Sequence, residues 1–132
     1  MTAFYKHYGQ RAYRHGNDTF TLEAYEAEHG YNVKCTYPAR GNATVALLQL
    51  APVYGETVYL DEYDEYGAQL IERPVIALKG WDVGVRPDFR RRGIAKAMYA
   101  YAREMFRLPI RAGDFQTPDG ERLLAEVKEL VK

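Results

Sequence analysis

Cysteine is almost missing from this sequence. Its 132 residues include one, Cys35, which excludes an intramolecular disulfide framework and a cluster of cysteine metal ligands. Such sparse use of cysteine is typical of a reducing compartment, so we expect a cytoplasmic protein in which Cys35 is a buried structural thiol. The three histidines, His7, His15 and His29, show neither pairing nor metal-ligand spacing, and we therefore expect no metal.

A long apolar run and a net charge are missing as well. No stretch approaches the roughly 20 apolar residues of a membrane helix. The basic amino-terminal residues 6–14 have no apolar segment behind them, so we expect no signal peptide and no membrane association. The 18 basic and 18 acidic residues cancel, and we expect no nucleic-acid partner because the overall field attracts none. With 47% apolar residues, residues 1–132 suffice for a single domain with its own core.

What the sequence does contain is a local separation of charge. Residues 61–72 include five acids and no base, which gives −5. Residues 86–107 include seven bases and two acids, which gives +5. Two such blocks suit two different ligands, and the alternative for the acidic block is a solvated loop.

Apolar alternation and turn residues predict strands in the first part of the chain. Residues 19–28 and 31–37 alternate on either side of Gly30 and predict a hairpin. Residues 43–50 form a nearly continuous apolar run, which is typical of a central strand. Residues 4–15 mix aromatic and basic side chains, and here we expect a short helix or an irregular arm.

Strands and helices are both predicted in the second part of the chain. A weak strand at residues 57–60 precedes a better one at 75–85 that we expect to be bulged near Gly80. Apolar residues at helical spacing predict a helix from Ile94 to Met105 and, after a short strand-like segment, a last helix over residues 117–131.

The most informative segment joins a strand to a helix through three arginines and a glycine. Residues 83–95 read Val-Gly-Val-Arg-Pro-Asp-Phe-Arg-Arg-Arg-Gly-Ile-Ala. Gly93 lets the backbone turn tightly and approach a ligand, and the start of a helix presents free N–H groups and the positive end of the helix dipole. Together with the arginines, these features predict a site for a phosphorylated ligand. The alternatives are a basic turn that only caps the helix and a contact with nucleic-acid phosphates.

Spacing excludes two common phosphate loops and indicates a third. A Walker loop needs a glycine, four residues and then Gly-Lys-Ser or Gly-Lys-Thr, and Lys96 is not so placed. A dinucleotide fingerprint needs three glycines, whereas Gly93 stands alone in its turn. The segment resembles the pyrophosphate loop of the GNAT acetyltransferases, in which Arg or Gln is followed by two residues, glycine, one residue, and glycine or alanine. Here the loop reads Arg90-Arg91-Arg92-Gly93-Ile94-Ala95, and the resemblance covers residues 76–112.

The resemblance implies a fold. We expect an α/β (mixed α+β) single domain with a central, mostly antiparallel sheet. Its core is the family's fourth strand, pyrophosphate loop, third helix, fifth strand and fourth helix. The family's first two helices have no room between the strands of residues 19–50, and its terminal strands are also missing. A homodimer that covers the exposed edge of the fifth strand is therefore expected.

The resemblance also implies acetyl-coenzyme A as the acyl donor. Backbone groups of Val83 and Val85 would hold its pantetheine arm, and amides of residues 91–96 would hold its pyrophosphate. Arg90 would shape the loop rather than face the ligand. The residues so implied to bind the cofactor are Val83, Val85, Arg90, Arg91, Arg92, Gly93, Ile94, Ala95 and Lys96.

Acetyl transfer to an amine needs a base, a polarised thioester oxygen and an acid for the leaving thiolate. The resemblance gives the oxygen to the amide of Val83. The candidate bases are Asp82, next to this strand segment, and Glu72. The family's tyrosine on the fourth helix is missing here, which leaves Thr117, a water or a tyrosine of residues 59–66 as the acid.

These implied roles predict an N-acetyltransferase. It would move the acetyl group of acetyl-coenzyme A to a primary amine of a small molecule, peptide or protein. The acidic and aromatic residues 59–66 suit a cationic acceptor, because acids attract it and aromatic rings stack on its apolar stem. The alternative is a catalytically silent domain that binds coenzyme A or another protein.

Overall fold

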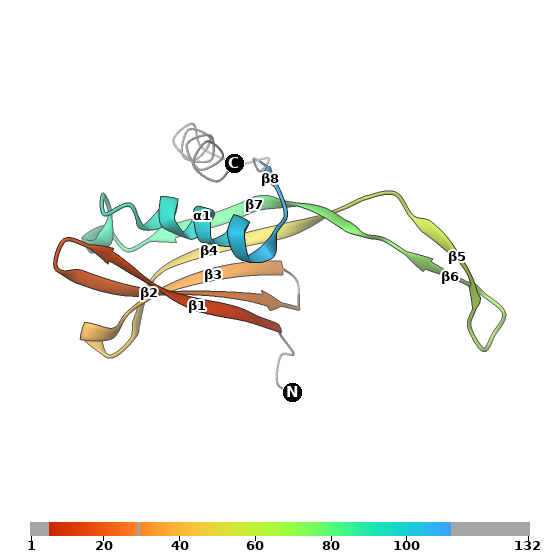
Figure 1. The fold of residues 1–132 in the computed structure, drawn as a ribbon, viewed down its shortest axis with the longest axis horizontal. Coiled ribbons are helices and arrows are strands. Elements are labelled where there is room, and N and C mark those ends of the chain that lie inside the picture. Colours follow the sequence, from red (N-terminus) through yellow and green to blue (C-terminus); the bar gives the residue numbers. More distant parts are fainter. Residues whose placement is uncertain (1–5, 29, 112–132) are drawn as a thin grey trace.

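A computed structural model describes residues 6–28 and 30–111. Six strands form one sheet in the order β1-β2-β3-β4-β7-β8, and β5 and β6 form a separate two-stranded ribbon. The strands are β1 Lys6–His15, β2 Asp18–Ala27, β3 Gly30–Tyr37, β4 Ala43–Tyr54, β5 Val58–Tyr63, β6 Gln69–Glu72, β7 Val75–Val85 and β8 Ile110–Arg111. The helical elements are the α-helix α1, Ile94–Phe106, and two 3₁₀ turns, η1 Pro38–Arg40 and η2 Pro87–Phe89. Figure 1 shows α1 lying across one face of the sheet.

The core lies between α1 and this face of the sheet. Alternate positions of the strands supply buried apolar side chains, including Phe20, Leu22, Ala24, Val33, Cys35, Leu48 and Leu50. Helix α1 covers them with Ile94, Met98, Tyr101 and Ala102, which recur at helical spacing. Burial raises the pKa of the Cys35 thiol to about 12, so the expected structural thiol is confirmed.

Several predicted elements are confirmed by the strand pairing. β2 and β3 form the expected antiparallel hairpin, with Ala24 opposite Val33. β4 lies between β3 and β7, as the apolar run of residues 43–50 predicted. The helix that begins at Ile94 is also present. In the part of the chain that is described, no helix is long and apolar enough to cross a membrane.

The expectation of a helix or an irregular arm in residues 4–15 is wrong. Lys6–His15 form β1, which pairs antiparallel with β2 along its length. These residues form a strand because of tertiary contacts: Tyr8 and Tyr13 are half-buried against the core. Tyr8 meets Phe106 of α1 with ring centroids 4.9 Å apart. Contacts of this kind depend on a distant helix, and a local pattern of residues does not reveal them.

The expected fold class is wrong as well. An α/β domain with the acetyltransferase core has several helices, whereas the described residues are mostly strand and include a single α-helix, α1. Four of the five pairings in the sheet are antiparallel, and antiparallel neighbours need no crossover helix between them. The helix predicted over residues 117–131 lies outside the described residues.

Residues 55–74 extend β4 and β7 beyond the sheet as a long projection, which we call the arm (Figure 1). At its root the Gly55 N–H donates to the Pro74 carbonyl at 2.7 Å. At its tip the Asp64 carboxylate accepts the N–H groups of Tyr66 and Ala68, both at 2.9 Å. The weak strand predicted at residues 57–60 is thus one side of a hairpin that stands apart from the core.

Candidate functional site

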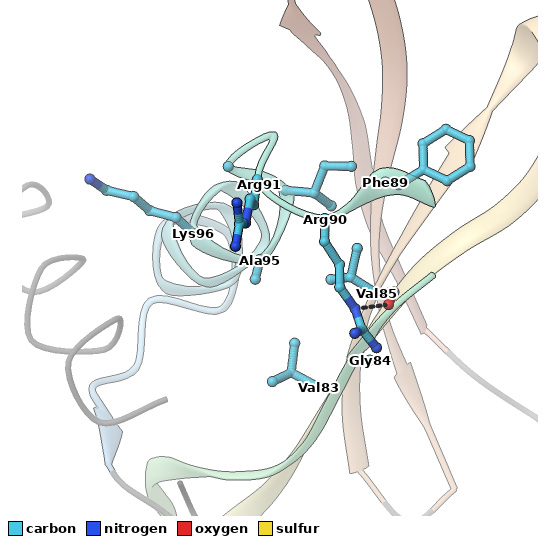
Figure 2. A pocket seen from close by; sticks show the side chains of 10 residues that line it. Val83, Gly84, Val85, Phe89, Arg90, Arg91, Ala95 and Lys96 are labelled. Carbon is cyan, nitrogen blue, oxygen red and sulfur yellow. Dashed lines mark hydrogen bonds between the residues drawn. The ribbon is translucent and has the colours of Figure 1, made fainter. Parts of the chain in front are cut away.

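A cavity of about 550 Å³ opens between the end of β7 and the start of α1 (Figure 2). This volume is in the usual range for small-molecule sites. Figure 2 shows Val83, Val85 and Ala95 facing the space between strand and helix, and Phe89 pointing away from it. The residues lining the cavity are Val83, Gly84, Val85, Phe89, Arg90, Arg91, Gly93, Ile94, Ala95 and Lys96.

One wall of the cavity is a free backbone edge. β8 pairs with β7 at Leu78 and Lys79, and among the described residues no strand pairs with β7 beyond them on that side. The N–H of Arg86 donates to Val45 of β4, at 2.9 Å. Because successive residues of a strand turn their backbone groups to opposite sides, Val83 and Val85 turn theirs to the free edge. An extended ligand can hydrogen-bond there as an added strand does.

A bulge in β7 precedes this edge. Gly80 lies opposite Leu50 and Asp82 lies opposite Gln49, so Trp81 is the extra residue. A bulge increases the local twist and changes the direction of the side chains that follow. Val83 consequently lines the cavity, while Trp81 is 66% exposed. The bulge predicted near Gly80 is confirmed.

The loop between strand and helix is anchored by Phe89. This ring is buried and contacts Phe20 and Tyr37 edge to face, with centroids 5.9 and 5.5 Å apart. The 3₁₀ turn η2 holds the backbone on either side through two hydrogen bonds, from Phe89 N–H to Arg86 and from Arg90 N–H to Pro87. The loop is therefore attached to the core on the side away from the cavity.

Two residues of the loop have left-handed backbone conformations, Arg91 with φ 63° and Gly93 with φ 71°. Tyr13 of β1 lies against them, and its hydroxyl donates to the Arg92 carbonyl at 2.6 Å. A Cβ at position 93 would lie 2.8 Å from this hydroxyl oxygen. Glycine is required at position 93 both by the positive φ and by this close approach.

The other wall is the beginning of α1. Its first turn closes with a hydrogen bond from Ala97 N–H to the Gly93 carbonyl, so the amides of Ile94 and Ala95 point out of the helix at this end. No side chain caps this end of the helix. Arg91 and Lys96 add positive charge at the same end, where the helix dipole also favours an anion.

The structure brings together eight of the nine residues that sequence reasoning placed at the cofactor. The exception is Arg92, whose guanidinium contacts the Asp18 carboxylate at 2.6 Å and lies over the Phe89 ring. Arg90 lines the cavity but folds back on the strand, where its Nε donates to the Val85 carbonyl at 3.2 Å (Figure 2). Arg90 thus shapes the loop.

The three candidate catalytic residues are not brought together. Asp82 follows the bulge, is exposed, and is next to Val83 without lining the cavity. Glu72 lies in β6 of the arm, opposite Val58, and also does not line the cavity. Thr117 lies outside the described residues.

Sequence reasoning missed two residues that shape the site. Tyr13 and Asp18 hold the loop from the β1–β2 hairpin, and no local signal links them to residues 90–93. Tyr99, one turn after Ala95 in α1, is buried in the core and does not line the cavity. Its pKa is raised, first by burial and then by the negative charge of Asp82.

Neither a metal-binding cluster nor a similar known protein points to a function for the cavity. Within residues 6–28 and 30–111, no three His, Cys, Asp or Glu side chains gather at a metal-binding distance. No protein-family model, curated protein or solved structure matches the chain.

Proposed function

We propose that this chain binds acetyl-coenzyme A in the cavity between β7 and α1 and transfers its acetyl group to a primary amine. The observation that carries the proposal is that two different binding surfaces, a strand edge and a helix N-terminus, adjoin in one cavity. A free strand edge at Val83 and Val85 leads directly to the positively charged start of a helix. Coenzyme A has the matching parts, an amide-containing pantetheine arm and a pyrophosphate. The resemblance of residues 90–95 to the GNAT pyrophosphate loop supports the same ligand.

In this proposal each part of the cavity has one task. The backbone of Val83 and the N–H of Val85 pair with the amides of pantetheine, because the Val85 carbonyl already accepts a hydrogen bond from Arg90. The amides of Ile94 and Ala95 at the start of α1 bind the pyrophosphate, and Arg91 adds a charge-assisted contact. The fold supplies these groups without requiring the acetyltransferase class of fold, since one strand, one loop and one helix are sufficient.

The proposed reaction begins with the attack of the amine nitrogen on the thioester carbonyl carbon. The N–H of Val83 stabilises the negative oxygen that forms. The carbon–sulfur bond then breaks, the thiolate leaves with the electron pair, and the nitrogen releases one proton. We assign Asp82, next to Val83, as the base. The thiolate takes its proton from water, because a thiol with an ordinary pKa of about 8.5 is a good leaving group without an acid from the chain.

The acceptor is proposed to approach from the side of β7 on which Trp81 and Asp82 are exposed and to reach the thioester past the unpaired edge of this strand. A smaller cavity of about 210 Å³ lies on this side and is lined by Trp81, Asn32 and Gln49, among others. Gln49 is the cross-strand partner of Asp82. An aromatic ring beside a carboxylate suits a cationic amine with an apolar stem.

A catalytically silent coenzyme A-binding domain is the second candidate. It is favoured by one specific observation, namely that neither Asp82 nor Glu72 lines the cavity in which the thioester would lie. In that case the chain would retain the binding site and lack turnover.

Calorimetric titration with acetyl-coenzyme A tests the shared premise. The double variant Arg91→Gln, Lys96→Gln should bind at least about tenfold more weakly, since removing charged contacts to phosphate costs on the order of 1.5–3 kcal/mol. Arg103→Gln, on the same helix but outside the cavity, is the matched control and should bind as the natural chain does. Equal affinity for all three proteins would refute this placement of the ligand.

Thiol release from acetyl-coenzyme A with a panel of primary amines separates the two candidates. A chromogenic disulfide reagent is suitable, because burial and the raised pKa leave Cys35 unreactive. Asp82→Asn should lower the turnover rate and leave the dissociation constant of acetyl-coenzyme A unchanged. Binding without release for any amine would support the silent domain instead.

A further inference from the structure

The arm, residues 55–74, has no hydrophobic support of its own. Neither the core nor the side chains packed against it include a residue of the arm, among the residues that the structure describes. β5 and β6 pair only with each other in this part of the chain. An isolated two-stranded hairpin is marginally stable in water and normally gains stability by packing against another surface. The tip turn and the root hydrogen bond order the arm locally but bury nothing.

Exposed apolar side chains gather on the arm and its root. All nine large hydrophobic residues that are exposed in the described chain lie between Tyr54 and Trp81. Six of them belong to the arm: Val58, Tyr59, Tyr63, Tyr66, Leu70 and Ile71. Scattered exposed hydrophobics are ordinary, whereas such a concentration marks an interaction surface.

Three of these side chains share one face. Tyr59 lies opposite Ile71, and Tyr63 lies opposite Gln69. Residues 69 and 71 of β6 are two apart and therefore point to the same side, which places Tyr59, Tyr63 and Ile71 together. Their exposed fractions are 68%, 64% and 54%. We call these three residues the docking face.

The charge of the arm indicates what covers it. The arm contains six of the 18 acids and one of the 18 bases, so its net charge is −5. Because the whole chain is neutral, the remaining residues carry +5. Two arms would repel each other, whereas the arm of one copy and the body of another attract.

The basic residues 86–107 border the coenzyme cavity, and strand β1 is a basic edge apart from them. Lys6 and Arg14 give β1 two positive charges besides Arg11, which is paired with Glu104 at 2.6 Å, and the strand contains no acid. It is the first strand of the sheet order, so one of its edges has no strand partner among the described residues. In a two-fold dimer the contact is made twice, which doubles the area that a single arm buries.

We propose that the arm docks on β1 of a second copy of this chain, with Tyr59, Tyr63 and Ile71 covered and the acids of the arm facing the bases of β1. The proposal concerns a surface apart from the coenzyme cavity and does not depend on the proposed activity.

Sedimentation velocity over a range of protein concentrations tests the proposal. We expect a dimer whose dissociation constant rises with salt, since the opposing charges are exposed. Tyr59→Ser with Ile71→Ser should weaken the dimer at least about tenfold, which is the loss of one buried interface anchor. Val58→Ser with Leu70→Ser, on the opposite face of the arm, is the matched control and should leave the dimer intact. Far-ultraviolet circular dichroism checks that every variant is folded.

Charge reversal tests the position of the contact. Glu62→Lys with Glu65→Lys should weaken the dimer, and Lys6→Glu with Arg14→Glu should weaken it similarly. An equimolar mixture of the two variants should form a heterodimer. In it the arm that carries the new lysines meets the β1 that carries the new glutamates, and the unchanged arm meets the unchanged β1, so both contacts join opposite charges. Three results would overturn the proposal: a monomer at every concentration, a dimer that is as stable with Tyr59→Ser and Ile71→Ser as without them, or a mixture of the two charge-reversed variants that does not associate.

Discussion

Gly93→Ala should break the hydrogen bond by which Tyr13 of β1 holds the loop at Arg92. A Cβ at position 93 would lie 2.8 Å from the hydroxyl oxygen of Tyr13, closer than real Cβ atoms approach. That hydroxyl donates to the Arg92 carbonyl at 2.6 Å. The added methyl group must displace the hydroxyl, and the hydrogen bond is lost with it.

The free energies follow from these contacts. Placing alanine at a φ of 71° costs about 1–2 kcal/mol, because its Cβ crowds the following carbonyl. Loss of the hydrogen bond adds about 1 kcal/mol. Gly93→Ala should therefore lower the free energy of unfolding by about 2–3 kcal/mol, and Tyr13→Phe by about 1 kcal/mol. In the double variant the hydrogen bond is lost once, so the total should be about 2–3 kcal/mol rather than 3–4.

Urea unfolding at equilibrium, followed by circular dichroism, measures all four proteins of this cycle. The expected coupling between the two substitutions is about 1 kcal/mol. Two independent effects that add to within about 0.3 kcal/mol would show that Tyr13 does not contact the loop. The placement of β1 against residues 92 and 93 would then be wrong.

Two further predictions concern the core beneath the site. Phe89→Ala removes the buried anchor of the loop; it should lower the free energy of unfolding by about 3–5 kcal/mol and also weaken acetyl-coenzyme A binding, as urea unfolding and calorimetry will show. A loop that kept full affinity would not depend on this anchor. The pKa of Cys35 is raised from 9.0 to about 12, so the folded chain holds a proton that the unfolded chain releases. The stability that this provides is complete below pH 9 and is lost as the pH rises toward 12, by up to about 4 kcal/mol. Cys35→Ala should flatten this alkaline loss in urea titrations at several pH values, and an unchanged pH dependence would contradict the assignment.

Patterns that depend on near neighbours in the chain were predictive. The alternation on either side of Gly30 specified the hairpin of β2 and β3, because turn chemistry and burial of one face act over a few residues. The segment from Val83 to Ala95 specified strand, turn and helix in the same way. Eight of the nine implied cofactor residues, Lys96 included, line one cavity, since a strand and a helix joined by a short loop must lie side by side.

Features that depend on distant residues were not predictable. Lys6–His15 carry no strong strand pattern, and they form β1 because Tyr8 and Tyr13 reach the core through α1 and β2. Arg92 is an arginine like its neighbours, yet Asp18, 74 residues away in sequence, draws it from the cavity. Glu72 was a candidate base because it is a carboxylic acid, but it lies in β6 of the arm, opposite Val58, and not at the cavity.

The sequence by itself determined that a strand, an arginine-rich turn and a helix would follow one another from Val83 onward, because each of these elements depends on local backbone preferences. Only the tertiary structure decided that this unit belongs to a domain whose described residues are mostly strand, rather than to an α/β fold with several helices. It also decided which arginines face the cavity and that residues 55–74 stand free of the core. Strand pairing and burial join residues far apart in the chain, and those pairings are set by the packing of the whole domain.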